Sequence, residues 1–287
     1  VTRNGIENTL VDLYKAGVYI GWEEFKGKKK LVRGTSEYEF KAVDFDNPFV
    51  SAGYQVQSSG TRSAGTRTTF DLRHLAEMSY YRLPTLEVNK SLDIPCLVWK
   101  AGLPSNAGIA NILQHAKVGK PVMRWFSMAS QGSMKTSFLQ RLATMYIIYG
   151  GRLMGASLPK EEYAGLEDAH KLAKLMVTLK KEYGSCSMAC TVTGAVKICL
   201  EAVQRGLDIG GTHFMVSGET LTEVKKRQIE AAGTTVTTRY STSEIGRIAT
   251  GCLETQYIDD AHLFHDSTAC IQRKKELEKF NVTVDAF

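Results

Sequence analysis

Short apolar runs alternate with amphipathic helical patterns along the chain from about residue 94 to residue 239. This alternation is typical of a mostly parallel sheet with helices on its faces, because parallel strands need long crossover connections that helices usually provide. The sequence therefore predicts an α/β fold. The predicted strands are 94–99, 122–126, 188–192, 213–216 and 235–239, and the predicted helices are 106–117, 135–149, 172–182, 195–205 and 220–232.

Polar residues and glycines mark several expected helix ends. Asp71 and Asn106 are predicted N-caps, because their side chains can accept hydrogen bonds from the first N–H groups of a helix. Gly119, Gly184 and Gly206 stand where helices should stop. The first fifty residues differ in character: a helical stretch is followed by a charged, aromatic one, and we expect this region to be a cover on the main sheet.

Composition narrows the class of protein. The 287 residues carry a net charge of +6 without a polybasic tract, which suits an anionic small ligand better than a nucleic acid. The six cysteines lack C-x-x-C spacing and a dense framework, so reduced thiols in a cytoplasmic protein are expected. No apolar run is long enough for a membrane span, and because the chain begins at Val1, it is expected to be a piece of a longer one.

One segment has the composition of a phosphate-holding loop. Residues 57–68, QSSGTRSAGTRT, combine glycines, hydroxyls and two arginines without an apolar period. Glycine lets backbone N–H groups approach an anion, and arginine matches the geometry of phosphate oxygens. Thr66 and Arg67 replace the lysine and hydroxyl residue of a P-loop, which disfavours a P-loop NTPase. A solvated surface loop is the alternative.

Two further segments follow predicted strands, where ligands gather in open α/β sheets. The first is 217–220, Ser-Gly-Glu-Thr, and the second is 240–244, Tyr-Ser-Thr-Ser-Glu. Tyrosine can lie against a purine, a hydroxyl can reach a phosphate, and a carboxylate can hold Mg²⁺. Alternatively, the first segment is only a helix N-terminus with an acid favoured by the dipole, and Tyr240 and Glu244 are an ordinary strand-end aromatic and a solvated charge.

Together these segments resemble the phosphate loop, the Gly-Glu segment and the Tyr-Gly-x-Thr-Glu segment of adenylate-forming enzymes, the acyl-CoA synthetases and adenylation domains. Cys252 followed by residues 262–266, His-Leu-Phe-His-Asp, is similar to the phenylacetate-CoA ligase and acyl-protein synthetase branch. The resemblance implies that 1–287 is the large N-terminal domain of such an enzyme, in a layered αβαβα arrangement. Residues 1–50 would be its cover and 51–287 its nucleotide- and carboxylate-binding core.

The resemblance also implies an AMP-forming acid–thiol ligase. ATP and Mg²⁺ would be used with a small carboxylic acid, and the acyl group would pass to coenzyme A or to the phosphopantetheine arm of an acyl carrier protein. Thr61, Arg62, Ser243 and Glu244 would be catalytic, with Glu244 holding Mg²⁺ and Tyr240 stacking on adenine. The implied nucleotide-binding residues are Ser58, Ser59, Gly60, Thr61, Arg62, Gly65, Thr66, Arg67, Ser217, Gly218, Glu219, Thr220, Arg239, Tyr240 and Ser241.

The sequence departs from the family pattern in several places. The loop lacks the usual Pro-Lys pair, and Ser241 replaces the glycine after the tyrosine. The family's ribose-binding aspartate and its small C-terminal domain would follow Phe287. Some relatives hold a structural zinc through the Cys and His that match Cys252 and His262 plus two later cysteines, so a zinc ion is not excluded.

Two other functions stay open. The first is a nucleotide-binding module, or a degenerate pseudo-enzyme, without a complete catalytic second domain. The second is an oxidoreductase or transferase with another anionic cofactor, which is disfavoured because no G-x-G-x-x-G follows a first strand.

Overall fold

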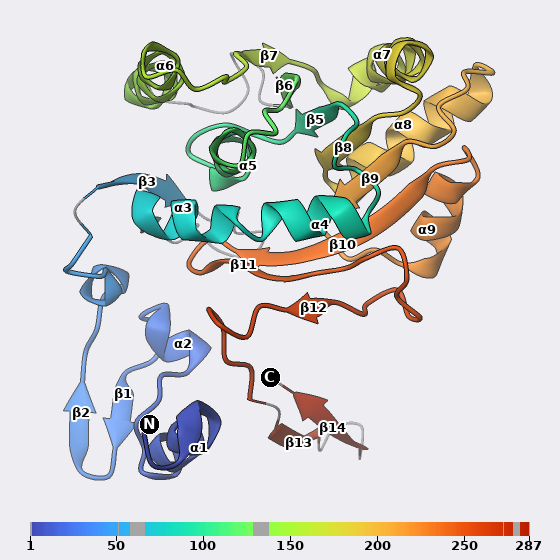
Figure 1. Ribbon diagram of the computed structural model, residues 1–287. Helices are drawn as coiled ribbons and strands as arrows, with labels where there is room; N and C mark the ends of the chain where they lie inside the picture. The colour runs from blue at the N-terminus through green and yellow to red at the C-terminus, as the bar shows by residue number, and fades with distance from the viewer. Residues whose placement is uncertain are drawn as a thin grey trace. The chain divides into compact units, whose positions relative to one another are not determined.

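The computed structural model describes residues 2–50, 52–57, 67–128, 138–271, 273–277 and 282–286 of the chain. It separates into two compact units. The first unit combines Val1–Asp46 with Leu263–Phe287, and the second unit is Asn47–His262. The alternating strands and helices belong to the second unit (Figure 1).

The second unit is built on an eight-stranded sheet with the strand order β12-β11-β10-β9-β8-β5-β6-β7. Adjacent strands from β7 to β10 are parallel, and β10 and β11 are antiparallel. The predicted α/β class with a mostly parallel sheet is therefore confirmed. The strands are β5 Cys96–Trp99, β6 Arg124–Ser127, β7 Glu161–Tyr163, β8 Ser187–Cys190, β9 His213–Val216, β10 Thr235–Thr242, β11 Gly246–Thr250 and β12 His262–Leu263.

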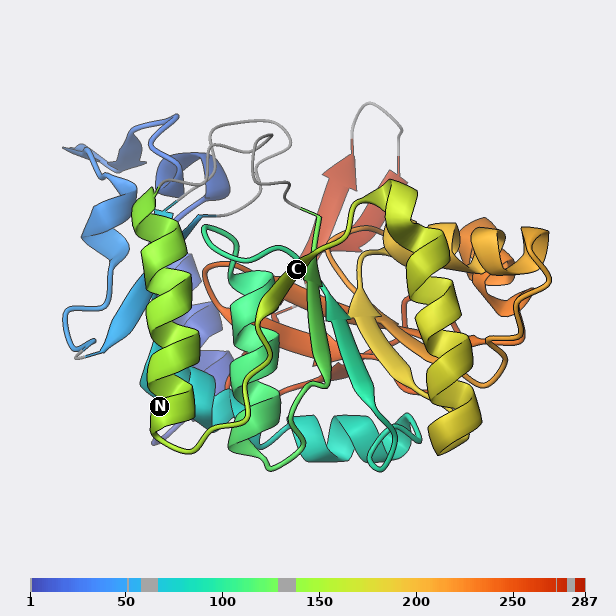
Figure 2. The ribbon, with the colours of Figure 1, turned by 90° about the horizontal axis from the view of Figure 1, so that it is seen from above.

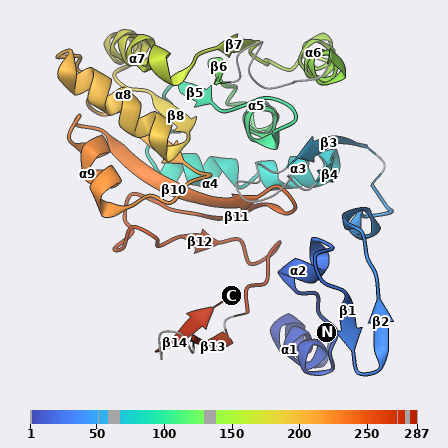
Figure 3. The ribbon, with the colours of Figure 1, turned by 180° about the vertical axis from the view of Figure 1, so that it is seen from behind.

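Helices cover both faces of this sheet. Seen from above, α5 and α6 lie on one side of the sheet and α7 lies on the other (Figure 2). From behind, α7, α8 and α9 form one layer, and α5 lies across the sheet from them (Figure 3). The helices are α3 Leu72–Ser79, α4 Arg82–Val88, α5 Asn106–Lys117, α6 Phe138–Leu153, α7 Ala169–Tyr183, α8 Val192–Gln204 and α9 Glu223–Glu230, with a short 3₁₀ helix at Leu166–Asp168.

Side chains of the central strands alternate between two apolar clusters, one on each face of the sheet. In β5, Leu97 and Trp99 pack with α7 and α8, whereas Val98 packs on the opposite face with α5. In β6, Phe126 joins the first cluster and Trp125 joins the second. Because both faces are covered, these strands appear in the sequence as continuous apolar runs.

The strand 213–216 and the helix 106–117 occur at their predicted bounds. The strand predicted at 188–192 is wrong at its end, because Thr191 is the N-cap of α8 and its Oγ1 accepts from the N–H of Gly194 at 3.1 Å. The helix predicted at 220–232 is likewise shorter: α9 begins at Glu223, after the N-cap Thr222. Residues 135–137, where another helix was predicted to begin, lie outside the described residues.

The helix-end predictions are mostly confirmed. Asp71 caps α3 by accepting from the N–H of Arg73 at 2.9 Å. The cap predicted at Asn106 is wrong, because Ser105 Oγ accepts from the N–H of Ala107 at 3.3 Å, and Asn106 Oδ1 instead accepts from the hydroxyl of Tyr54. All three predicted stop positions have a positive φ past the end of a helix, as a left-handed helix end requires: Gly119, Gly184 and Gly206.

The other sheets among the described residues are two-stranded and antiparallel. They pair β1 Leu31–Arg33 with β2 Ser36–Tyr38, β3 Gly53–Gln57 with β4 Arg67–Asp71, and β13 Arg273–Leu277 with β14 Val282–Ala286. Within the second unit, the large sheet and its two helical layers thus form an α-β-α sandwich, with the β3–β4 hairpin beside it.

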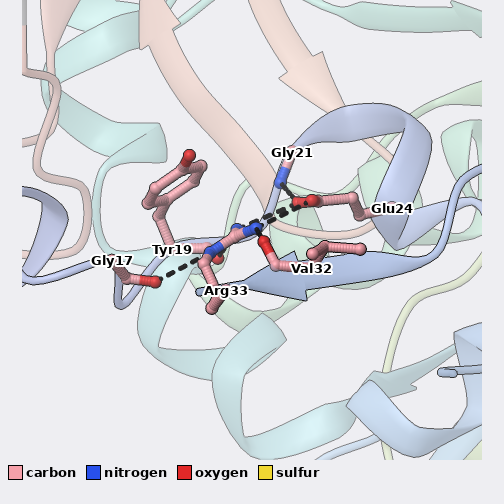
Figure 4. Close-up of polar contacts among 6 residues, drawn as sticks. All are labelled: Gly17, Tyr19, Gly21, Glu24, Val32 and Arg33. Atoms are coloured by element: carbon pink, nitrogen blue, oxygen red, sulfur yellow. Dashed lines mark hydrogen bonds and ion pairs between the residues drawn. The ribbon is translucent and has the colours of Figure 1, made fainter. Parts of the chain in front are cut away.

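The first unit is organised around Arg33 (Figure 4). It contains α1 Gly5–Lys15, α2 Trp22–Phe25 and a 3₁₀ helix at Ala42–Phe45. Arg33 donates to both carboxylate oxygens of Glu24, at 2.9 and 3.1 Å, and to the carbonyl oxygens of Gly17 and Tyr19. The hydrogen bonds that Glu24 accepts from Arg33 and from the N–H of Gly21 lower its pKa to about 2. The assignment of residues 1–50 as a cover on the sheet, and of 1–287 as one domain, stays a prediction.

Gly108 in α5 provides a test of how closely this helix approaches the sheet. A Cβ there would lie 2.6 Å from Trp125 Cζ2 and 2.7 Å from the carbonyl oxygen of Ala101. We expect Gly108→Ala to lower the free energy of unfolding by about 1–3 kcal/mol, because a buried ring and a backbone carbonyl would have to shift. Urea unfolding measures this change.

Gly150→Ala in α6 is the matched control, because a Cβ at that position meets nothing within 4 Å. Alanine there should leave the stability unchanged or raise it by up to about 1 kcal/mol, since helical glycine is entropically unfavourable. Equal unfolding midpoints for Gly108→Ala and the unsubstituted protein would contradict the close approach of α5.

Candidate functional site

The order of the strands creates a switch point between β5 and β8. From β5 the chain continues to β6 and β7 on one side of the sheet, and to β8, β9 and β10 on the other. Helices leave the carboxyl ends of the two strands toward opposite faces, and ligands of open α/β sheets bind in the crevice that such switch points create. Lys100 follows β5 at this point, and Thr191 follows β8.

Lys100 is a buried cation at the switch point, with only 5% of its surface exposed. Its ammonium group donates to Ser217 Oγ at 2.7 Å and to the carbonyl oxygen of Ser217 at 3.2 Å. Its own carbonyl oxygen accepts from the indole N–H of Trp125 at 2.8 Å. Burial, together with the positive charge of Arg239, lowers the pKa of Lys100 to about 8. Lys100 is therefore held in place at both its backbone and its side chain.

The segment after β9 contacts Lys100 across the end of β8, which lies between β5 and β9. Gly218 has a φ of +88°, which favours glycine, and this turn directs Glu219 back toward α8. Glu219 Oε2 accepts from the N–H of Thr193 at 2.8 Å and from its hydroxyl at 2.7 Å. The prediction that Glu219 begins a helix is wrong: it binds the first turn of α8, where the helix dipole favours an acid. Thr220 is exposed beside it.

Tyr240, Ser241 and Thr242 continue β10 instead of following it. The strand predicted to end at Arg239 runs to Thr242, with a bulge between Tyr240 and Ser241, and then turns into the antiparallel β11. Ser243 and Glu244 are partly exposed in the turn of this hairpin, and 61% of the surface of Tyr240 is exposed. These side chains thus lie beyond the parallel part of the sheet, which ends at the pairing of Thr238 with Val216.

The stems of the predicted phosphate loop lie beside the β10–β11 hairpin. The loop joins β3 to β4, and the ring of Phe70 in β4 lies 3.4 Å from where a Cβ of Gly246 would be. In the helix that follows, His74 Nε2 is hydrogen-bonded to the carbonyl oxygen of Ile245 at 3.0 Å. Arg67, at the start of β4, is the described member of the loop set. The others lie outside the described residues: Ser58, Ser59, Gly60, Thr61, Arg62, Gly65 and Thr66.

Arg239 is buried, unlike the exposed residues of the β10–β11 hairpin that follow it. Its guanidinium group donates to Asn111 Oδ1 of α5 at 3.1 Å and to the sulfur of Met215 in β9. The side chain therefore faces α5 in the interior, whereas Tyr240, the next residue, is exposed. The role of Arg239 as a nucleotide ligand stays a prediction, like the roles of the other residues assigned from the family resemblance.

The Cys252 and His262 pair meets as the family resemblance implies, with 3.2 Å between Cys252 Sγ and His262 Nε2. Two such groups leave a tetrahedral zinc site incomplete. Among the described residues, no group of three or more His, Cys, Asp or Glu side chains is arranged to hold a metal ion.

All six cysteines are free, as predicted. No helix in the described part of the chain is both long and apolar enough to cross a membrane.

Lys100 was missing from the predicted site. A usable signal was present, because Lys100 directly follows the predicted strand 94–99, the position that pointed to Ser217 and Tyr240. Near Lys100, Trp125, Phe126 and Phe214 are core residues, and Thr193 lies on the surface, bound to Glu219.

No known protein-family model matches this chain, and no curated protein matches it. Solved structures to which this chain is similar include 2-hydroxyisobutyryl-CoA ligase in the postadenylation state, at 13% identity and a TM-score of 0.44 over 79% of this chain and 40% of that one. They also include an acyl-CoA synthetase (AMP-forming)/AMP-acid ligase II-like protein from Dyadobacter fermentans, at 12% identity and a TM-score of 0.40 over 81% and 55% of the two chains.

A third structure is the luciferase-like enzyme of the mealworm Zophobas morio, at 11% identity and a TM-score of 0.43 over 71% and 38% of the two chains. This chain thus spans between 38% and 55% of the length of these proteins. Likenesses this distant establish no activity, so the function proposed below depends on the residues of the site.

The buried ammonium group of Lys100 predicts a pH dependence of stability. Its pKa is about 8 in the folded chain, against the ordinary 10.5, so between these values the unfolded chain binds the additional proton. The contribution of Lys100 to the free energy of unfolding must therefore rise with pH between these two pKa values. We expect the unsubstituted protein to gain stability relative to Lys100→Met between about pH 7 and about pH 10.

Urea unfolding of both proteins at each pH measures this difference. Lys174→Met, at an exposed side chain of α7, is the matched control, and its difference from the unsubstituted protein should stay constant over the same range. A constant difference for Lys100→Met as well would show that the ammonium group is solvated in the folded chain.

Proposed function

We propose that this chain is the nucleotide-binding part of an enzyme that activates a small carboxylic acid with ATP, forming an acyl-adenylate. The acyl group then passes to a thiol, that of coenzyme A or of a carrier-protein arm. The motifs that resemble the adenylate-forming enzymes support this function, and so does the placement of the described members of those motifs in the fold.

One observation carries the proposal. The elements that follow the predicted phosphate loop contact the residues that follow Tyr240–Glu244: the ring of Phe70 in β4 lies against Gly246, and His74 in α3 is hydrogen-bonded to the carbonyl oxygen of Ile245. A nucleotide needs this arrangement, because its phosphates and its base are bound by different segments that must face one ligand. At the carboxyl ends of β5 and β9, Lys100 donates a hydrogen bond to Ser217 of the Gly-Glu segment.

In this proposal the residues act mainly by position and charge. Attack of a carboxylate on the α-phosphorus requires an in-line geometry and compensation of the negative charge that spreads over the phosphate oxygens. Arg62 and Arg67 would bind the outer phosphates, Tyr240 would lie against adenine, and Ser243 would donate to the α-phosphate. Lys100 would place a positive charge in a water-poor crevice, where charge compensation is most effective.

Glu244 would hold the Mg²⁺ that accompanies ATP. Its carboxylate is partly buried in the β10–β11 turn, and carboxylate oxygens are among the ligands that Mg²⁺ prefers. When bound, the ion would neutralise charge on the phosphates. The site would then be assembled from the loop between β3 and β4, from the ends of β5 and β9, and from the β10–β11 hairpin.

Carboxylate-dependent exchange of labelled pyrophosphate into ATP tests the proposal. Across a panel of aryl and alkyl acids, we expect one acid class to support exchange, and Glu244→Gln should reduce this exchange by about a hundredfold or more. Glu254→Gln, at an exposed side chain, is the control and should leave the rate unchanged. Residues 1–287 are compared with the longest natural form of the chain.

The outcomes separate the two leading functions. Exchange that survives in Glu244→Gln would remove this residue from the mechanism. ATP binding by both forms without exchange from either would replace the ligase with the nucleotide-binding module. Exchange from the longer form alone would show that residues beyond 1–287 supply catalytic groups.

Tyr240→Ala tests the proposed contact with the base. Stacking of an aromatic ring on a base contributes about 1–3 kcal/mol, so we expect ATP and AMP to bind about tenfold more weakly or worse, and by the same factor. Tyr257→Ala is the matched control, because 68% of Tyr257 is exposed, close to the 61% of Tyr240. Calorimetric titration with both nucleotides measures the affinities. Unchanged ATP affinity in Tyr240→Ala would place the base elsewhere.

A further inference from the structure

Three arginines form a buried polar layer between the large sheet and the helices α4 and α5. Arg82 belongs to α4, Arg239 to β10 and Arg247 to β11. Their exposed fractions are 0%, 8% and 4%. Arginine is almost never this deeply buried without a partner of opposite charge, so the layer requires an explanation.

Neutral amides of α5 accept hydrogen bonds from all three guanidinium groups. Asn111 Oδ1 accepts from Arg82 Nη2 at 3.1 Å and from Arg239 Nη1 at 3.1 Å. Gln114 Oε1 accepts from Arg82 Nη2 at 2.5 Å and from Arg247 Nη2 at 2.9 Å. Two amide oxygens thus connect all three guanidinium groups, and neither brings a negative charge.

Some N–H donors of the arginine layer have no acceptor in the described part of the chain. Nε and Nη1 of Arg82 and Nε of Arg239 are buried without a hydrogen-bond partner. Within the described residues, neither Arg82 nor Arg239 has a carboxylate partner. A guanidinium group keeps its proton in proteins. The positive charge therefore stays in the interior, where an uncompensated ion costs several kcal/mol.

The titratable neighbours do not supply the missing charge. Burial raises the pKa of the Cys96 thiol, so this group keeps its proton. Burial and the charge of Arg82 hold the pKa of His115 well below its usual range, so this imidazole is neutral. His213, on the same side of β9 as Met215, is hydrogen-bonded to the hydroxyls of Thr235 and Thr237. The layer as a whole is positively charged.

We propose that this arginine layer is a binding site for a small oxyanion of the phosphate or carboxylate class. The oxyanion would accept hydrogen bonds from Arg82 Nε and Nη1 and from Arg239 Nε, the donors that the chain leaves unmatched. Both guanidinium groups bind Asn111 Oδ1 and are therefore neighbours, and an oxyanion offers several acceptor oxygens to donors from two side chains. The site shares β10 with the proposed nucleotide site but uses buried side chains that face α5, and it stands without the nucleotide site. In this proposal Arg239 binds the buried anion and not the nucleotide.

Such a site predicts that oxyanions stabilise the folded chain. A ligand that binds only the folded state raises the midpoint of thermal unfolding as its concentration increases. We therefore expect inorganic phosphate to raise the midpoint when it replaces chloride at constant ionic strength. Arg82→Met, which keeps the aliphatic stem but removes the donors, should weaken the apparent phosphate affinity by about tenfold or more.

Arg205→Met is the matched control. Arg205 is an exposed arginine just past α8 that pairs with Glu201, so its loss should leave the phosphate response intact. Acetate at the same ionic strength distinguishes the class of ligand. A response to phosphate alone assigns a phosphoryl-type group, and a response to both assigns small oxyanions in general.

Asn111→Asp keeps the test decisive if Arg82→Met does not fold. The substitution places a carboxylate between Arg82 and Arg239 at nearly unchanged volume. It should raise the midpoint in phosphate-free buffer and remove the response to phosphate, because the new carboxylate takes the place of the anion.

Three results would overturn the proposal. One is a thermal midpoint of the unsubstituted protein that does not respond to phosphate or acetate. Another is a phosphate response that is the same in Arg82→Met or in Asn111→Asp as in the unsubstituted protein. The third is a phosphate response that saturating ATP removes, since the phosphate would then bind at the nucleotide site.

Discussion

The hydrogen bond from the indole N–H of Trp125 to the carbonyl oxygen of Lys100 connects the core of the second unit to its candidate site. Trp125 is fully buried between β6 and α5, and α5 can approach it only because residue 108 is glycine. A polar indole nitrogen in the core needs an acceptor. The carbonyl that satisfies it belongs to the residue that brings a cation to the switch point of the sheet.

Positive charge inside the second unit is a recurring feature. Lys100 lies at the carboxyl edge of the sheet, and Arg82, Arg239 and Arg247 lie between the sheet and α5. Lys100 and Arg239 are close enough for the charge of one to lower the pKa of the other. Buried cations are unfavourable unless something negative compensates them. The interior of this unit is therefore suited to anionic ligands, and the modest net charge of +6 does not reveal it.

The sequence predicted the elements better than their ends. The strand 213–216 and the helix 106–117 were predicted correctly, because apolar period and length separate them clearly. The ends near 191, 222 and 242 were wrong, because a threonine can be the last residue of a strand or the cap of a helix, and only the neighbouring backbone decides. Lys100 was missed for another reason: a single lysine after a strand has no local feature that predicts burial.

The sequence by itself determined the α/β class and the two-sided burial of the central strands. These follow from residue type and periodicity, which are local properties. Only the tertiary structure decided that β4 and α3 contact the β10–β11 hairpin, that Lys100 bonds Ser217, and that three arginines from separate elements converge on two amides. These contacts join residues far apart in the chain, and they depend on the order of strands in the sheet, which local pattern does not encode.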